Sequence, residues 1–139
     1  MSEVLGLIAD EPDVLDLKIA SAAITEMRDA FAVFAPYRDV RKVSIFGSAR
    51  TRPDDPLYDQ ARRLARRLAD AGWMAVTGAG PGIMQAGMEG AGVARSIGVS
   101  IRLPFEERAN SIIADDEKHV SMKYFFTRKL MLIKESSAF

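Results

Sequence analysis

The sequence contains no cysteine and only one histidine, His119. Without cysteine the chain forms no disulfide framework and performs no thiolate chemistry, and this composition is typical of a reducing cytosol. A single histidine cannot build a site with several histidine ligands. We therefore expect a cytoplasmic protein without a histidine- or cysteine-based metal centre.

An excess of charge of one sign is also missing. The chain has 19 basic and 19 acidic side chains, and its formal net charge is zero. General nucleic-acid binders carry a basic surplus, so this balance argues against one, although it leaves room for a local anion site. Residues 1–13 lack the basic start and long apolar core of a secretory signal, and no apolar run is long enough to span a bilayer. We expect neither nucleic acid nor membrane as a partner.

The 139 residues suffice for one domain with a real core. Residues 1–12 show little periodicity and are expected to be poorly ordered, whereas residues 13–139 are expected to form a single domain. Apolar periodicity predicts helices at 13–34, 57–72, 83–94 and 122–136. Short apolar, β-branched runs predict strands at 43–47, 73–78 and 97–104, with a further short strand near Val120.

Strands that alternate with helices predict an α/β fold, here a Rossmann-like, doubly wound parallel sheet with helices on both faces, preceded by an N-terminal helix. The strands are rich in Val and Ile without clean alternation, which suits burial on both faces. The final residues, 137–139, look like the beginning of another strand.

The helix predicted at 57–72 has two distinct faces, and Gly72 stands where a helix-terminating glycine belongs. Its apolar face is expected to point inward and consists of Leu57, Ala61, Leu64 and Leu68. A cluster of four arginines lies away from that stripe: Arg62, Arg63, Arg66 and Arg67. Such a cluster is most often a solvated face, so we favour that interpretation over a role in binding phosphate or nucleic acid.

Two glycine-containing loops follow predicted strands, Gly47-Ser48-Ala49-Arg50 and Gly78-Ala79-Gly80-Pro81-Gly82. In open α/β sheets, ligands bind outside the carboxyl ends of the strands, where both loops lie. Glycine lets the backbone approach an anion closely, and the N–H groups at the start of the next helix point at it. Ser48 adds a hydroxyl group and Arg50 a positive charge.

The second loop matches the dinucleotide-binding fingerprint only in part, because Ile83 stands where the third glycine belongs. Taken alone, the loop fits a structural turn as well as a phosphate cradle, but two such loops on neighbouring strands favour the cradle. Arg128 and Lys129 interrupt an otherwise apolar helix. They either extend to solvent or reach an anionic ligand, and spacing does not decide between the two.

Three segments together resemble the Lonely Guy (LOG) family, whose members have been mislabelled as lysine decarboxylases: VSIFGSAR, VTGAGPGIMQAGMEGA and YFFTRKLMLIKESSAF. The resemblance runs from about residue 41 to residue 139. It implies a Rossmann-like sheet, usually in a homodimer. It also implies a phosphoribohydrolase that cuts the N-glycosidic bond of a nucleoside 5′-monophosphate, such as AMP or a cytokinin riboside 5′-monophosphate, into free base and ribose 5-phosphate. No metal or redox cofactor is expected.

The resemblance also assigns site residues. It implies that Arg128 is catalytic and that Lys129 is its partner. The residues implied to contact the nucleotide are Gly47, Ser48, Gly78, Gly80, Gly82 and Asn110.

One motif of the family, Pro-Gly-Gly-x-Gly-Thr-x-x-Glu, is expected directly after residue 139 and does not occur in the sequence. It carries phosphate-binding glycines and the second catalytic residue, a glutamate, so we expect this chain to be the N-terminal part of a longer protein.

Three other functions compete with the hydrolase. A nucleotide- or molybdenum-cofactor-binding protein needs the same loops but no catalytic acid. A dinucleotide-dependent oxidoreductase is disfavoured by the broken fingerprint and by Arg102-Leu103-Pro104, where an acidic residue is expected. A lysine decarboxylase is the weakest alternative, because no lysine has a recognisable pyridoxal phosphate context.

Overall fold

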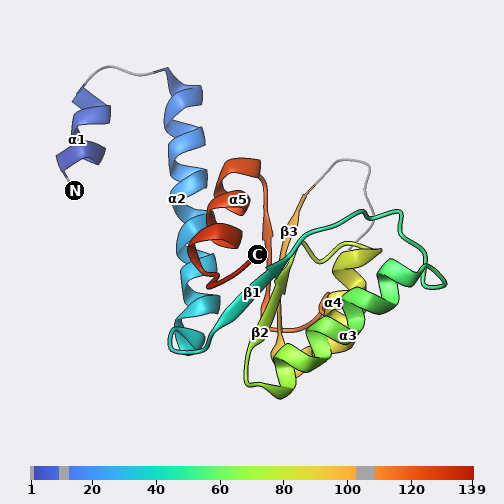
Figure 1. Cartoon of the computed structure of the whole chain (residues 1–139). Helices are drawn as coiled ribbons and strands as arrows, with labels where there is room; N and C mark the ends of the chain where they lie inside the picture. The colour runs from blue at the N-terminus through green and yellow to red at the C-terminus, as the bar shows by residue number, and fades with distance from the viewer. Residues whose placement is uncertain (1, 10–12, 103–108) are drawn as a thin grey trace.

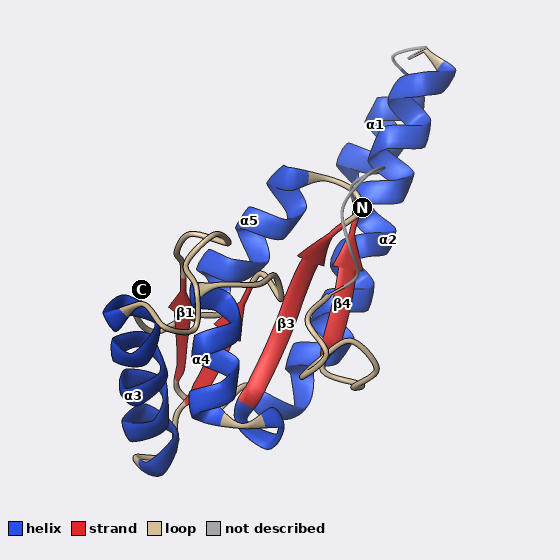
Figure 2. Ribbon diagram, turned by 90° about the vertical axis from the view of Figure 1, so that its right-hand side faces the viewer, coloured by secondary structure: helices blue, strands red, loops and turns tan. Residues whose placement is uncertain are grey.

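In the computed structural model, which describes residues 2–9, 13–102 and 109–139, the centre of the fold is a four-stranded parallel sheet. Its strands are all parallel and lie in the order β1-β2-β3-β4, and the arrowheads of β1, β3 and β4 point the same way in Figure 2. Their bounds are β1 Lys42–Ile45, β2 Met74–Thr77, β3 Ser96–Ile101 and β4 His119–Met122. The predicted Rossmann-like parallel sheet and the short strand near Val120 are confirmed.

Helices cover both faces of the sheet, as predicted. Helices α3 and α4 lie on one face, and α2 and α5 lie on the other (Figures 1 and 2). The helices are α1 Ser2–Ala9, α2 Val14–Phe34, α3 Pro56–Asp70, α4 Ile83–Ala91 and α5 Phe125–Lys134, with 3-10 turns η1 Ala35–Tyr37 and η2 Val93–Arg95. The main core lies between the sheet and the α2–α5 layer, where Phe34, Val76, Ile97, Val99 and Met131 are almost fully buried.

The end of the chain returns to the sheet beside β1. The Ser44 amide donates to the Ala138 carbonyl at 2.9 Å, and the Ser137 amide donates to the Lys42 carbonyl at 2.8 Å. Val43 and Ala138 form a parallel bridge, so the predicted start of another strand is confirmed. Strand β2 pairs with the other edge of β1, so the chain extends the sheet on both sides of β1. The strand order therefore reverses at β1, and α/β sheets bind ligands at such a switch point.

The inward face of α3 differs from the prediction. Leu57 and Leu64 are 60% and 52% exposed, whereas Tyr58 and Ala65 are buried. The reason is the contact with α4, because a Cβ atom on Gly90 would overlap the Arg62 carbonyl of α3. This close approach turns the Tyr58–Ala65 side of α3 inward and leaves Leu57 and Leu64 outside, whereas Ala61 and Leu68 of the predicted inner face are half-buried.

The arginine cluster lies on the solvated face of α3, as favoured by its pattern. All four arginines are exposed. Two of them form surface ion pairs with Asp59, at 2.7 Å from Arg62 and 3.0 Å from Arg63. Exposed pairs of this kind contribute little to stability.

Three other element predictions need correction or lie partly outside the structure. No helix was predicted before residue 13, where α1 lies. Helix α4 ends at Ala91 and not at residue 94, because Gly92 has a φ of +78° and leaves the helical conformation. Strand β3 ends at Ile101, and the predicted strand residues 103–104 lie outside the described residues.

Candidate nucleotide-binding edge

The two glycine loops form one unit at the carboxyl edge of the sheet. The amide of Ile83, the first residue of α4, donates to the Ser48 carbonyl at 3.1 Å. Gly82 has a φ of +67°, and a Cβ atom there would lie 2.8 Å from the carbonyl carbon of Ala49. Only glycine permits both this conformation and this approach. The structure therefore brings Gly47 and Ser48 together with the Gly78–Gly82 loop.

The second loop has a fixed backbone. Ala79 is fully buried and has a φ of +58°, which is uncommon for a residue with a side chain. Its amide donates to the Thr77 hydroxyl at 3.0 Å, and its carbonyl accepts from the Asn110 amide at 2.8 Å. A residue held in this way in a sparsely populated conformation indicates a site whose surroundings impose the geometry.

Asn110 is placed against the glycine loop. Its side-chain Nδ2 donates to the Gly80 carbonyl at 3.0 Å, and its Oδ1 accepts from the Ile112 amide at 3.3 Å. The structure thus brings Asn110 to the predicted site through contacts with the protein, where it fixes the loop and the turn that follows residue 109.

Arg128 crosses from α5 to the same edge. Its Nε donates to the Val99 carbonyl at 2.9 Å, and its Nη2 donates to the Gly78 carbonyl at 3.3 Å. A Cβ atom on Gly78 would overlap the guanidinium group, so the missing side chain of Gly78 is what admits Arg128. The half-buried guanidinium is held by a carbonyl within β3 and by the carbonyl just after β2, and it is not simply extended into solvent.

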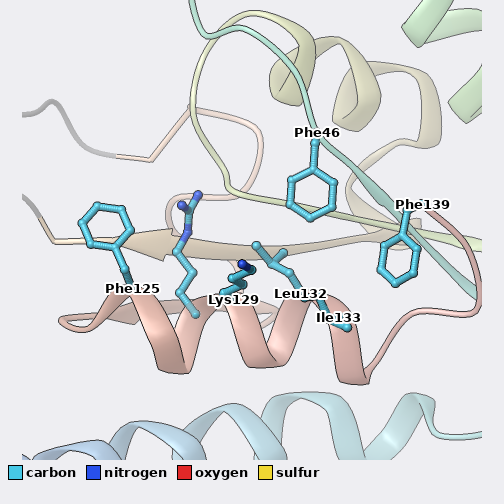
Figure 3. Close-up of a pocket in the computed structure, with 7 residues that line it drawn as sticks. Phe46, Phe125, Lys129, Leu132, Ile133 and Phe139 are labelled. Atoms are coloured by element: carbon cyan, nitrogen blue, oxygen red, sulfur yellow. The ribbon is translucent and has the colours of Figure 1, made fainter.

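An apolar pocket of about 500 Å³ lies next to Arg128. Figure 3 shows Phe125, Lys129, Leu132 and Ile133 along α5, with Phe46 and Phe139 opposite them. Lys129 is exposed and lines this pocket together with Arg128. The charged side chains among the described residues that line it, Arg128 and Lys129, are both cations, and their positive charge suits an anionic ligand.

Sequence reasoning missed the five apolar residues of this pocket. Those on α5 lie three or four residues before or after Arg128 or Lys129, a helical spacing that could have placed them on one side of the helix. Phe46 follows β1 and Phe139 follows Ala138, and the two side chains reach the same pocket only because Val43 pairs with Ala138. No local pattern in the sequence indicates that pairing.

Within the described ranges, no helix is long and apolar enough to cross a membrane. The same residues contain no group of three or more histidine, cysteine, aspartate or glutamate side chains placed to hold a metal ion.

A parallel sheet with helices on both faces and two interlocked glycine loops at its carboxyl edge defines a Rossmann-like protein of the nucleotide-binding class. Residues 40–132 match the SLOG cluster4 family, and the chain belongs to that family. The SLOG superfamily includes the LOG family, which agrees with the resemblance in the glycine loops and in α5. No curated protein matches the chain. Fold and family together indicate a nucleotide-related function.

Proposed function

We propose that the protein hydrolyses the N-glycosidic bond of nucleoside 5′-monophosphates of the AMP or cytokinin riboside type, releasing the free base and ribose 5-phosphate. The observation that carries the proposal is the position of Arg128. Its guanidinium is bound to the carbonyls of Gly78 and Val99, and its side chain also lines a pocket of nucleotide size. A cation fixed between a phosphate-type loop and an aromatic pocket suits a ligand that has both a phosphate and a base.

In this proposal each part of the edge contacts one part of the nucleotide. The glycine loops and the N-terminus of α4 receive the phosphate through backbone N–H groups, and the Ser48 hydroxyl and Lys129 support them. Phe46, Phe125 and Phe139 offer faces on which a base can stack. Arg128 holds the nucleotide in register, so that phosphate-binding energy serves the reaction at the sugar.

The reaction breaks the bond between C1′ and the base nitrogen. The bonding electrons leave with the base, which gains a proton, while water adds to C1′ and loses one. Positive charge develops on the sugar, and a carboxylate stabilises it or activates the water. In the proposal this carboxylate is the glutamate of the Pro-Gly-Gly motif that the resemblance expects after residue 139.

One observation favours a second candidate, a nucleotide or molybdenum-cofactor binder without turnover. The charged side chains described around the pocket, Arg128 and Lys129, are both cations. Holding a phosphate requires only the loops and the cations.

Product chromatography separates the two functions. The full-length protein is incubated with a panel of nucleoside 5′-monophosphates, and free base and ribose 5-phosphate are quantified. The hydrolase predicts both products in equal amounts from the wild type and none from a folded Arg128→Ala variant. Bound but unchanged nucleotide favours the binder, and full activity of the variant would refute the role of Arg128.

We also propose that two copies pair through the exposed apolar side chains of α2 and α5. Leu17, Ile24 and Phe31 recur every seven residues on α2 and are 37%, 49% and 41% exposed. This spacing is typical of helices that pack against another helix. On α5, which contacts α2, Phe126 and Leu130 are 57% and 45% exposed.

Sedimentation velocity tests this pairing. We expect a dimer for the wild type and a monomer for Ile24→Glu. The control Leu57→Glu adds the same charge at an exposed leucine of α3, on the other face of the sheet, and should stay dimeric. A monomeric wild type, or a dimeric Ile24→Glu variant, would contradict the proposal.

A further inference from the structure

Helix α2 lies before the family segment, which spans residues 40–132, yet it reaches the helix that carries Arg128. The contact is made by Glu26, a charged side chain that is only 7% exposed. One carboxylate oxygen accepts a short hydrogen bond from the Lys123 amide. The other accepts from the Tyr124 amide at 3.3 Å and lies 2.8 Å from the Thr127 hydroxyl, whose single hydrogen is shared with the Tyr124 carbonyl at the same distance.

These three donors are all at the N-terminus of α5. A helix begins with amide groups that have no partner within the helix, and its N-terminus carries a partial positive charge. In the described chain, Tyr124 provides α5 with no side-chain cap and the first turn has no acidic residue. Glu26 therefore does for α5 what a local cap does for most helices, from a residue about a hundred positions earlier.

The cap is connected directly to Arg128. The Tyr124 residue that donates its amide to Glu26 also accepts, through its carbonyl, the Arg128 amide at 3.2 Å. Thr127, the neighbour of Arg128, is fully buried. The backbone of Arg128 is thus fixed from the α2 side, while its guanidinium is fixed by the carbonyls of Val99 and Gly78.

We propose that Glu26 is a positioning residue for the nucleotide site: its carboxylate fixes the first turn of α5 and thereby the placement of the Arg128 guanidinium. The statement about ligand binding rests on the proposed function, whereas the statement about Arg128 does not. The segment before the family match is, in this account, part of the functional machinery.

The test uses Glu26→Gln, which keeps the size of the side chain but loses the charge and one acceptor. Its control is Asp29→Asn, the same change one turn along α2 at an exposed carboxylate that pairs with Arg28 on the surface. Hydrogen exchange is followed by NMR at the Tyr124 amide and at the Arg128 Nε–H group, which is identified by its absence in Arg128→Lys. The Ile97 amide of β3 provides the internal reference for global opening.

Glu26→Gln weakens the charge-assisted hydrogen bonds between the Glu26 carboxylate and the first turn of α5. We therefore expect hydrogen exchange at the Tyr124 amide and at Arg128 Nε–H to accelerate at least tenfold relative to the Ile97 amide. We also expect the Kd for AMP to rise about tenfold. Asp29→Asn should match the wild type in both. Unchanged exchange at Arg128 Nε–H would overturn the proposal, and so would unchanged AMP binding despite faster exchange.

A second pair of variants covers the case in which Glu26→Gln does not fold. Thr127→Val removes the hydroxyl without changing the shape, and Thr127→Ser keeps it. Acceleration in Thr127→Val but not in Thr127→Ser, both at Arg128 Nε–H and at the Tyr124 amide that donates to Glu26, supports the proposal, and equal exchange in both variants contradicts it. If the wild type binds no AMP, the proposed function fails, and exchange at Arg128 Nε–H still decides the role of Glu26.

Discussion

Replacing Gly82 by alanine tests whether the two glycine loops are as closely packed as the structure shows. Gly82 has a φ of +67°, and a new Cβ atom would lie 2.8 Å and 2.9 Å from the C and Cα atoms of Ala49. These are backbone atoms, so the overlap cannot be relieved by rotating a side chain. The loops after β1 and β2 must move apart.

The expected loss of stability has two parts. Holding alanine in this conformation costs about 1–3 kcal/mol, and forcing the loops apart costs about 1–3 kcal/mol more. The sum is roughly 4 kcal/mol, which for a chain of this size lowers the melting temperature by roughly 14 °C. A protein of typical stability remains folded after such a loss, but with little margin.

Gly72→Ala is the matched control. Gly72 has a φ of +86°, but a Cβ atom there would meet no atom within 4 Å. This variant therefore suffers the conformational cost alone, about 1–2 kcal/mol. Urea unfolding of both variants measures the difference. Equal losses in the two variants would refute the close packing of the loops.

The remaining predictions concern the site and the packing of α3. Gly78→Ala should displace the Arg128 guanidinium and raise the Kd for AMP about tenfold in a titration; unchanged binding would contradict the placement of Arg128. Leu64→Gln should change the free energy of unfolding by less than about 0.5 kcal/mol, whereas Ala65→Leu should lower it by about 1–3 kcal/mol. A larger loss in Leu64→Gln than in Ala65→Leu would show that Leu64, and not Ala65, faces the interior. Burial, helped by the Glu89 carboxylate, raises the pKa of Tyr58 to about 12 from 10.0. Because the unfolded chain then loses this proton first, thermal stability should fall between pH 10 and pH 12, and this fall should be weaker in Tyr58→Phe.

The sheet could be predicted from sequence because apolar runs of strand length alternate with helical periodicity, a local signal. The orientation of α3 could not. Its pattern offers a leucine stripe as the obvious inner face, and only the approach of Gly90 to Arg62 on another helix selects the Tyr58–Ala65 side. Amphipathic pattern thus identifies a helix more reliably than it identifies the face that is buried.

The candidate site divides in the same way. The glycine loops and Arg128 stand out in the sequence because phosphate chemistry restricts residue types locally. Phe46 and Phe139 do not, since only the pairing of Val43 with Ala138 brings them to one pocket. Glu26 gives no signal at all, because its partners lie about a hundred residues further along the chain.

The central claim is that this edge of the sheet recognises a nucleoside 5′-monophosphate through Arg128. Calorimetric titration of the protein with AMP and with adenosine tests it most directly, because the two ligands differ only in the phosphate. We predict that AMP binds at least tenfold more tightly than adenosine and that a folded Arg128→Ala variant loses this preference. Equal affinity for the two ligands, or an undiminished preference in Arg128→Ala, would contradict the account.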